Sequence, residues 1–169
     1  MIKFFVGAVV GICLVLAAEY FYVARGGLNM ATDRGPLPME RWLTQKALTA
    51  SIGKSGDEKS PLPADETNLL AGAHIYQQTC AGCHGHLGQG PSGLSKRVYP
   101  HIPPLLPPGH GVTDDPVGAI HWVVKNGIRF SAMPSFAGKL QDNELWQVSL
   151  FLHGADKLPT PVQDFLHTK

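Results

Sequence analysis

The hydrophobic residues of this chain are distributed unevenly, with one long apolar run at the amino terminus. The run extends from Phe4 to Ala24 and contains a single charged residue, Glu19, near its far end. A helix of this length spans about 30 Å, which matches the hydrocarbon core of a bilayer. Lys3 precedes the run and aromatic residues close it, as is typical of a helix that crosses a membrane. We therefore expect residues 1–24 to form a transmembrane anchor.

An uncleaved or cleaved secretory signal is the alternative interpretation of this run. A basic start followed by an apolar region fits such a signal, but a cleavage site also needs small residues at positions −1 and −3. Cleavage after Ala18 places Leu16 at position −3, and cleavage after Ala24 places Tyr22 there. We therefore favour an uncleaved anchor, and both interpretations place the remaining chain outside the cytoplasm.

Turn-forming and charged residues dominate residues 25–64, which indicates a connector. Within it, residues 38–48 predict a short helix with Pro38 in its first turn. The apolar residues of this helix share one face or lie beside it: Met39, Trp42, Leu43 and Ala47. We favour a helix that packs on its own domain or on the membrane surface. The alternative is a helix that docks a partner subunit.

Helical periodicity organises residues 65–155. Asp65 or Thr67 is predicted to cap a first helix that reaches Cys80. A second helix is predicted over residues 116–126, with a left-handed stop at Gly127. A third helix is predicted to begin at the capping residue Asp142 and to end at Gly154, and residues 156–169 follow as a carboxyl-terminal tail.

These patterns predict an all-α domain with long loops, because no alternating strand pattern of useful length occurs. A Pro-rich segment over residues 99–108 excludes helix and central strand there. Roughly 90 residues with so much loop have little core of their own, so another group must fill the interior.

The charge of the chain excludes one function class. Fourteen Lys and Arg against thirteen Asp and Glu give a net charge of +1, and no block of like charge occurs. A nucleic-acid-binding protein normally carries a concentrated basic surface, so we expect no nucleic-acid partner. Three cysteines are too few for a disulfide scaffold.

The segment Cys80-Ala81-Gly82-Cys83-His84 is the attachment signature for c-type haem. Thiols three positions apart at a helix end reach two carbons on one haem edge, and the next residue, His84, then turns its imidazole under the iron. A redox dithiol usually follows a strand, and a zinc site needs a second cysteine pair, whereas the remaining cysteine is Cys13 in the apolar run. The signature predicts one covalently attached haem c, with iron bound by His84.

Met133 is the candidate for the second axial ligand. It lies in an irregular loop after Gly127, where Pro134 restrains the backbone. A lone methionine more often fills a core, but its place in this loop favours ligation. His101 or His110 would instead give a bis-histidine iron, and an open sixth position is the remaining alternative.

Residues 65–154 resemble a class I, single-haem cytochrome c domain of the bacterial membrane-linked type. The resemblance rests on the helix with Gly72 and Tyr76 that ends in the Cys-x-x-Cys-His-Gly motif, the Pro-rich loop, the Asn-Gly-Ile and Met-Pro segments, and the Glu-Leu-Trp helix. It implies the class I cytochrome c fold, with the first and last helices crossing at Gly72 against Trp146 and Leu150. It also implies that a proline carbonyl, that of Pro104 or a neighbour, accepts a hydrogen bond from His84.

The sequence also suggests which residues line the haem pocket and which bind the haem propionates. The expected apolar lining is Leu105, Leu106, Ile120, Ile128 and Phe136. The candidate donors to the haem propionates are Arg97, Tyr99, Trp122 and Arg129.

An iron closed on both sides by His84 and Met133 suits single-electron transfer rather than the conversion of a substrate. We therefore expect a membrane-tethered electron carrier or the haem subunit of a respiratory or dehydrogenase complex, and no small-molecule substrate. The haem domain is expected in the periplasm, anchored to the bacterial inner membrane by residues 4–24, where it meets redox partner proteins or membrane complex subunits. A haem-based gas sensor or a peroxidase-like enzyme, with an open or displaceable sixth ligand, is the alternative.

Overall fold

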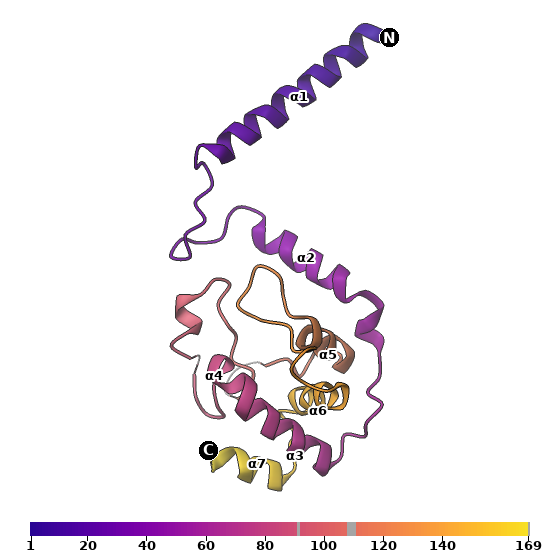
Figure 1. Ribbon diagram of the computed structural model, residues 1–169, viewed down its shortest axis with the longest axis vertical. Coiled ribbons are helices and arrows are strands. Elements are labelled where there is room, and N and C mark those ends of the chain that lie inside the picture. Colours follow the sequence, from indigo (N-terminus) through magenta and orange to yellow (C-terminus); the bar gives the residue numbers. More distant parts are fainter. Residues whose placement is uncertain (91, 108–110, 169) are drawn as a thin grey trace. The chain divides into compact units, whose positions relative to one another are not determined.

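The computed structural model describes residues 1–90, 92–107 and 111–168, and in these ranges every regular element is a helix. This confirms the predicted all-α class. Figure 1 shows the elements, which in chain order are α1 (Ile2–Ala24), α2 (Glu40–Ile52), η1 (Gly53–Asp57), α3 (Glu66–Ile75), η2 (Tyr76–Cys80), α4 (Ala81–His84), η3 (Ser95–Arg97), α5 (Val117–Asn126), α6 (Asp142–His153) and α7 (Thr160–His167). The chain divides into two compact units, Met1–Arg41 and Trp42–Lys169.

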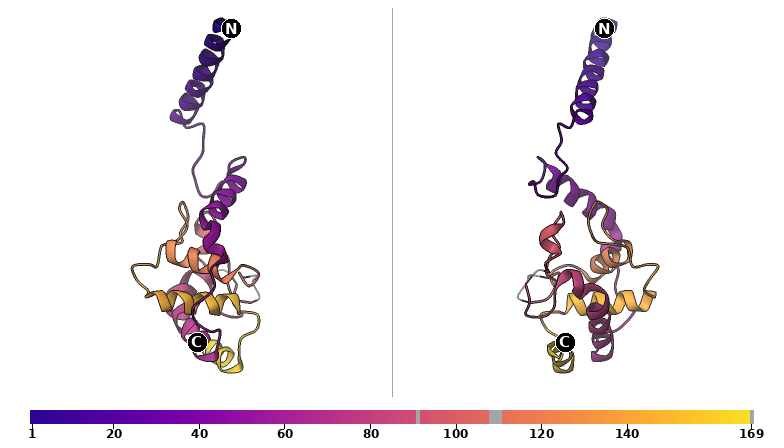
Figure 2. Two further views of the ribbon diagram at one scale, coloured as in Figure 1. Left: turned by 90° about the vertical axis from the view of Figure 1, so that its right-hand side faces the viewer. Right: turned by 60° about the vertical axis from the view of Figure 1, so that its left-hand side comes forward.

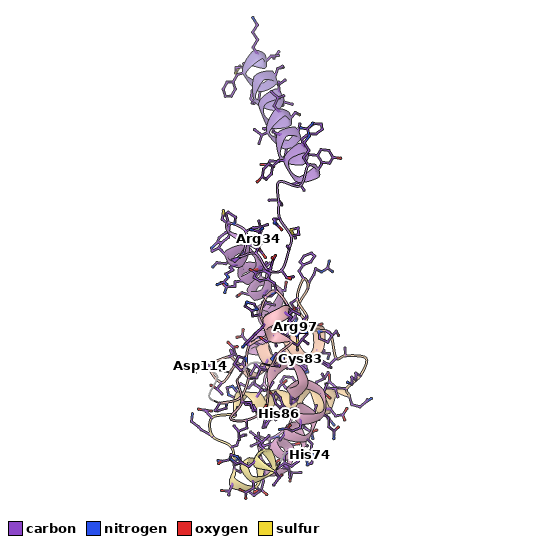
Figure 3. All side chains as sticks on the ribbon, turned by 90° about the vertical axis from the view of Figure 1, so that its left-hand side faces the viewer. Arg34, His74, Cys83, His86, Arg97 and Asp114 are labelled. Atoms are coloured by element: carbon purple, nitrogen blue, oxygen red, sulfur yellow. The ribbon has the colours of Figure 1, made fainter. Side chains whose placement is uncertain are left out.

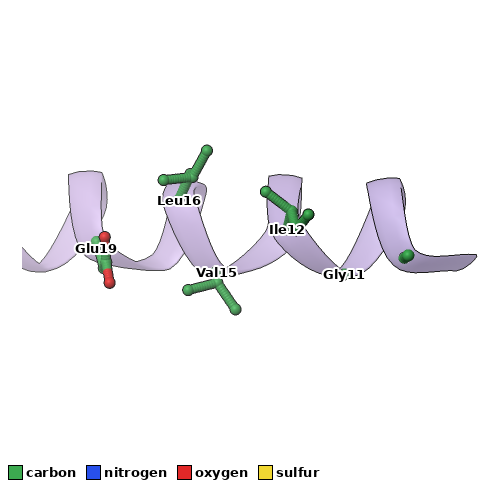
Figure 4. A pocket seen from close by; sticks show the side chains of 6 residues that line it. Gly11, Ile12, Val15, Leu16 and Glu19 are labelled. Carbon is green, nitrogen blue, oxygen red and sulfur yellow. The ribbon is translucent and has the colours of Figure 1, made fainter.

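The first unit is dominated by α1. By its length and composition this helix can cross a membrane, and none of its residues is buried within the protein. Figure 4 shows a shallow hollow on its surface, lined by apolar side chains and by Glu19. A signal sequence passes the same test of length and hydropathy, so the helix itself does not separate the two interpretations.

The second unit is built on the crossing of α3 and α6 at Gly72. A Cβ atom at Gly72 would collide with the carbonyl oxygen of Gln147 and lie 2.7 Å from the Cβ of Phe151. Phe151 and Tyr76 are fully buried beside this point, with ring centroids 5.6 Å apart. The crossing at Gly72 was predicted, but its partners on α6 were assigned one position too early.

Trp146, one of the two expected crossing partners, faces α5 instead. Its ring stacks on His121 with centroids 3.8 Å apart and an interplanar angle of 3°. Consecutive positions on a helix point about 100° apart, so Trp146 points away from the face on which Gln147 and Phe151 meet α3. The α6 helix thus packs on two neighbours at once.

Local signals define several helix ends. Asp65 caps α3, because its carboxylate accepts a hydrogen bond from the Asn68 amide at 2.9 Å. Gly127 follows α5 with a φ of 70°. At the start of α6 the cap is Gln141, whose amide donates to the Glu144 carboxylate at 2.7 Å. Asp142, the expected cap, is the first helical residue instead.

Asp142 pairs with Lys125 of α5 at 2.8 Å. This ion pair joins the start of α6 to the end of α5. Side-chain hydrogen bonding to Lys125 keeps the pKa of the exposed Asp142 carboxyl below its usual value.

Two segments of the second unit lie outside the cytochrome-like pattern and pack on its helices. The η1 turn lies against α5, where a Cβ at Gly118 would come within 2.6 Å of the Ser55 carbonyl oxygen. The α7 helix, which the sequence pattern did not indicate, packs on α3 with Val162 and Leu166 buried. Figure 2 shows α7 beside α3, at the end of the unit away from α2.

Candidate haem site

One nearly continuous helical path carries the chain into the Cys-x-x-Cys-His motif. The α3 helix passes into the π-helical turn η2, which ends at Cys80, and α4 follows directly. A π turn adds a residue to the helical repeat and so rotates whatever follows it, and such turns are frequent at functional sites. Here the turn sets the direction in which Cys80, Cys83 and His84 leave the helix.

Two side-chain hydrogen bonds hold the end of this path. The buried hydroxyl of Tyr76 donates to the Gly85 carbonyl at 2.7 Å, and the Ser92 hydroxyl donates to the Cys83 carbonyl at 2.7 Å. Carbonyls at a helix end lack partners within the helix, so these bonds satisfy groups that would otherwise need water. Burial raises the pKa of the Tyr76 phenol, with a smaller contribution from Cys80, and this keeps the phenol a proton donor.

His84 is oriented by the Pro-rich segment. Its Nδ1 lies 2.8 Å from the carbonyl oxygen of Pro103. A carbonyl can only accept, so Nδ1 carries the proton and Nε2 keeps its lone pair. Burial lowers the pKa of His84, and the bond to Pro103 acts in the opposite direction. The acceptor was expected to be Pro104 or a neighbour, and it is the preceding residue, Pro103.

The two cysteines of the motif lie near the carboxyl end of this helical path. Cys80 is buried and Cys83 is half-buried, and neither forms a disulfide. Burial raises the pKa of the Cys80 thiol to about 12; nearby Lys139 lowers it, and Cys83 raises it. Figure 3 shows Cys83 and His86 at this part of the second unit.

The loop with Met133 is closely tied to the end of α5. The Ile128 amide donates to the Met133 carbonyl at 3.1 Å, and the Met133 amide donates to the Ser131 hydroxyl at 3.1 Å. The Ser135 hydroxyl donates to the Lys125 carbonyl at 2.6 Å. Met133 itself is half-buried against the apolar core that also contains Cys80.

The expected apolar lining is largely buried. Leu105, Leu106, Ile120 and Phe136 belong to the same core as Cys80, whereas Ile128 is half-buried outside it. Pro104 is half-buried beside Leu105.

The alternative histidine ligands and the candidate propionate donors are less well defined. The Nδ1 of the exposed His101 lies 3.0 Å from the Ser95 carbonyl oxygen, and His110 lies outside the described residues. Among the candidate propionate donors, Arg97 and Arg129 are exposed, whereas Tyr99 and Trp122 are half-buried.

The residues present fit a covalently attached haem. A histidine held through Nδ1 offers Nε2 to a metal, and hydrogen bonds of this kind fix the ring of metal-bound histidines generally. Two unpaired thiols precede it at the required spacing, and a thioether from Met133 joins the same apolar core. The sequence did not point to Ser92, because its hydroxyl reaches the Cys83 carbonyl only once the chain between them has folded back.

One known family matches the central part of the chain. The model of the family described as "Cytochrome C oxidase, cbb3-type, subunit III" matches residues 67–152, just over half of the 169 residues. The chain belongs to this family. Membership in the cbb3-type subunit III family confirms the resemblance to a cytochrome c domain and implies that the chain binds haem. The matched range contains the whole Cys-x-x-Cys-His motif and Met133, and excludes α1, α2 and α7.

Two known proteins are similar to parts of the chain. The Cbb3-type cytochrome c oxidase subunit FixP of Rhizobium etli is 29% identical over 102 residues, a match that covers 56% of this chain and 32% of that protein. The chain therefore spans about a third of the length of this curated relative. Among solved structures, the Kuenenia stuttgartiensis reducing HAO-like protein complex Kustc0457/Kustc0458 contains a chain that is 22% identical, with a TM-score of 0.45. That match covers 62% of this chain and 48% of the other.

Proposed function

We propose that this chain is a membrane-tethered c-type cytochrome that carries single electrons as the haem subunit of a membrane complex. One haem is attached through thioethers to Cys80 and Cys83, and its iron is bound by His84 and Met133. The haem domain lies on the periplasmic side of the bacterial inner membrane, and α1 is its single anchor. The relative from Rhizobium etli, named as an oxidase subunit, supports a terminal oxidase as the complex.

The observation that carries this proposal is the hydrogen bond from His84 Nδ1 to the Pro103 carbonyl. It commits one ring nitrogen to the protein and leaves the other as a ligand in a fixed direction. When bound, a haem supplies an iron that changes between two oxidation states by one electron. Histidine and methionine as the two axial ligands raise the reduction potential of such an iron.

The chain's own residues account for a carrier rather than a catalyst of substrate conversion. Pro103 keeps the His84 ring in one orientation, and the hydrogen bonds at Ile128 and Ser131 hold the Met133 backbone. The buried side chains of Leu105, Leu106 and Phe136 exclude water from the surrounding core. A site that holds both ligands in place needs little rearrangement when the iron changes its charge.

Absorption spectroscopy of the purified full chain tests this proposal. We expect a low-spin iron with the weak near-infrared band of a sulfur ligand, and no immediate spectral change when carbon monoxide is added to the reduced protein. In Met133→Ala the sulfur band should be lost and the reduction potential should fall, whereas Met39→Ala, an exposed methionine of the first unit, should change neither. A high-spin reduced spectrum that responds at once to carbon monoxide in the unaltered chain would favour a gas sensor or a peroxidase.

A further inference from the structure

The large apolar side chains that the second unit exposes are concentrated at one end. In the described part of this unit they are Trp42, Leu43, Leu94 and Phe130, with exposed fractions of 56%, 60%, 45% and 86%. They come from three segments far apart in sequence: α2, the residue before η3, and the loop after α5. Figures 1 and 2 show these three segments at one end of the unit and α7 at the opposite end. We call the four residues the apolar end.

The same segments carry more basic than acidic residues. The α2 helix begins with Glu40, whereas residues 42–56, 92–107 and 127–141 contain no Asp or Glu. Their basic residues are Lys46, Lys54, Lys96, Arg97, Arg129 and Lys139. Figure 3 shows Arg97 toward the end of the unit that carries α2, and His74 toward α7. Although the whole chain is nearly neutral, the segments around the apolar end are therefore basic.

Phe130 is held outward by its backbone. Its φ of 60° lies in the left-handed region, which is unfavourable for a bulky side chain, and its ring gains no burial in return. The bond between the Ser131 hydroxyl and the Ile128 carbonyl, at 2.7 Å, fixes the loop around it. Unfavourable conformations of this kind concentrate at functional sites. The outward position of Phe130 therefore indicates a surface that another molecule covers.

We infer that the apolar end rests on the surface of an anionic phospholipid bilayer, which fixes the orientation of the haem domain above the membrane. The inference rests on the membrane anchor of the proposed function. Aromatic side chains favour the headgroup level of a bilayer, and Lys and Arg beside them are attracted to anionic lipids. A second copy of this chain fits the surface less well, because equal basic surfaces would face each other.

The chain that joins the two units keeps this surface near the lipid. Residues 25–41 separate α1 from Trp42, and an extended segment of this length reaches at most about 60 Å. Leu28, Met30 and Met39 within it are also exposed. A weak contact suffices under such a tether, because the effective concentration of the lipid surface is high.

Spin labels on the full-length, haem-loaded chain test the inference in vesicles of equal parts phosphatidylcholine and phosphatidylglycerol. In a Cys13→Ser background, a nitroxide is attached at Trp42→Cys or at Phe130→Cys. Matched controls carry it at Glu66→Cys on α3 or Asp164→Cys on α7, which are exposed positions outside the apolar end. Collision of each label with oxygen, which concentrates in lipid, is compared with collision with a water-soluble nickel complex.

Labels at 42 and 130 should collide preferentially with oxygen, several-fold more than the controls, and this preference should weaken when phosphatidylglycerol is omitted. Equal behaviour of all four labels overturns the inference. The inference is also overturned if the labels at 42 and 130 become shielded from the nickel complex only when a redox protein is added, because the surface would then be a protein interface. If the labels stay in water while the chain remains bound to vesicles after an alkaline wash, only this inference fails. If the chain washes off, the anchor of the proposed function fails with it.

Discussion

Gly127 lies directly against the backbone of Met133. A Cβ atom at Gly127 would come within 2.8 Å of the Met133 carbonyl oxygen and within 2.7 Å of the Pro134 carbonyl carbon. Gly127 also has a φ of 70°, which side chains other than glycine adopt only with strain. The residue that ends α5 therefore also sets the position of the proposed sulfur ligand.

Replacing Gly127 should disturb that ligand. Gly127→Ala combines a left-handed backbone with a contact that only a shift of the methionine loop relieves, so the free energy of unfolding should fall by about 1–3 kcal/mol. The near-infrared sulfur band should weaken in the same variant. Gly138→Ala is the matched control, because it lies after the same methionine and its Cβ meets no atom within 4 Å. Equal unfolding curves and spectra for the two variants would show that the loop does not depend on Gly127.

The crossing of α3 and α6 leaves no space for a methyl group at Gly72. In Gly72→Ala the new Cβ meets the Gln147 carbonyl, and because backbone cannot rotate away the two helices must separate. We expect a loss of about 3 kcal/mol in the free energy of unfolding, measured by chemical denaturation of the haem-loaded chain. Gly138→Ala, outside the haem motif and with no atom within 4 Å of its Cβ, should leave stability nearly unchanged. A Gly72→Ala variant as stable as Gly138→Ala would place the helix contact elsewhere.

His121 should make stability depend on pH. It is buried against Trp146, and its Nε2 has no hydrogen-bond partner in the described structure. Burial, with a smaller effect of Lys125, lowers its pKa below the ordinary 6.5, while Asp142 and Glu58 raise it. As the pH falls, His121 is therefore protonated at a higher pH in the unfolded chain than in the folded chain. Stability is greatest above this pH and declines as the pH falls toward the lowered pKa, by at most about 1.4 kcal/mol per pH unit.

Denaturation curves between pH 7.5 and about pH 5 measure this effect. His121→Phe keeps an aromatic ring against Trp146 and should flatten the decline. His167→Phe, an exposed position on α7, should retain it. A decline of equal slope in both variants would assign the pH dependence to other groups.

The parts of the fold that were predicted correctly depend on local signals. Asp65 caps α3 and Gly127 ends α5 because a short polar side chain and a residue without Cβ act on the nearest turn, whatever the rest of the chain does. The placement of Gly72 at a helix crossing came from the family pattern. The placement of Cys80, Cys83 and His84 together required only the spacing of the motif, and their roles in binding haem remain predictions.

The parts that were missed depend on packing between distant segments. The π turn before Cys80 changes which face of the helix continues, and no pattern of polar and apolar residues records it. The sequence narrows the acceptor for His84 to Pro104 or a neighbour, and only the path of the whole Pro-rich segment decides that it is the carbonyl of Pro103. The α7 helix is short, and its two buried residues, Val162 and Leu166, have a partner only once α3 is in place.

The most direct test of the central claim is the mass of the full-length protein after unfolding. The unfolded protein should have the mass of the polypeptide plus one haem, with no reactive thiol at Cys80 or Cys83. The double variant Cys80→Ala with Cys83→Ala should lose the added mass, whereas Cys13→Ala, which alters the cysteine of α1, should keep it. A polypeptide mass alone in the unaltered protein, with both motif thiols open to alkylation, would contradict the account.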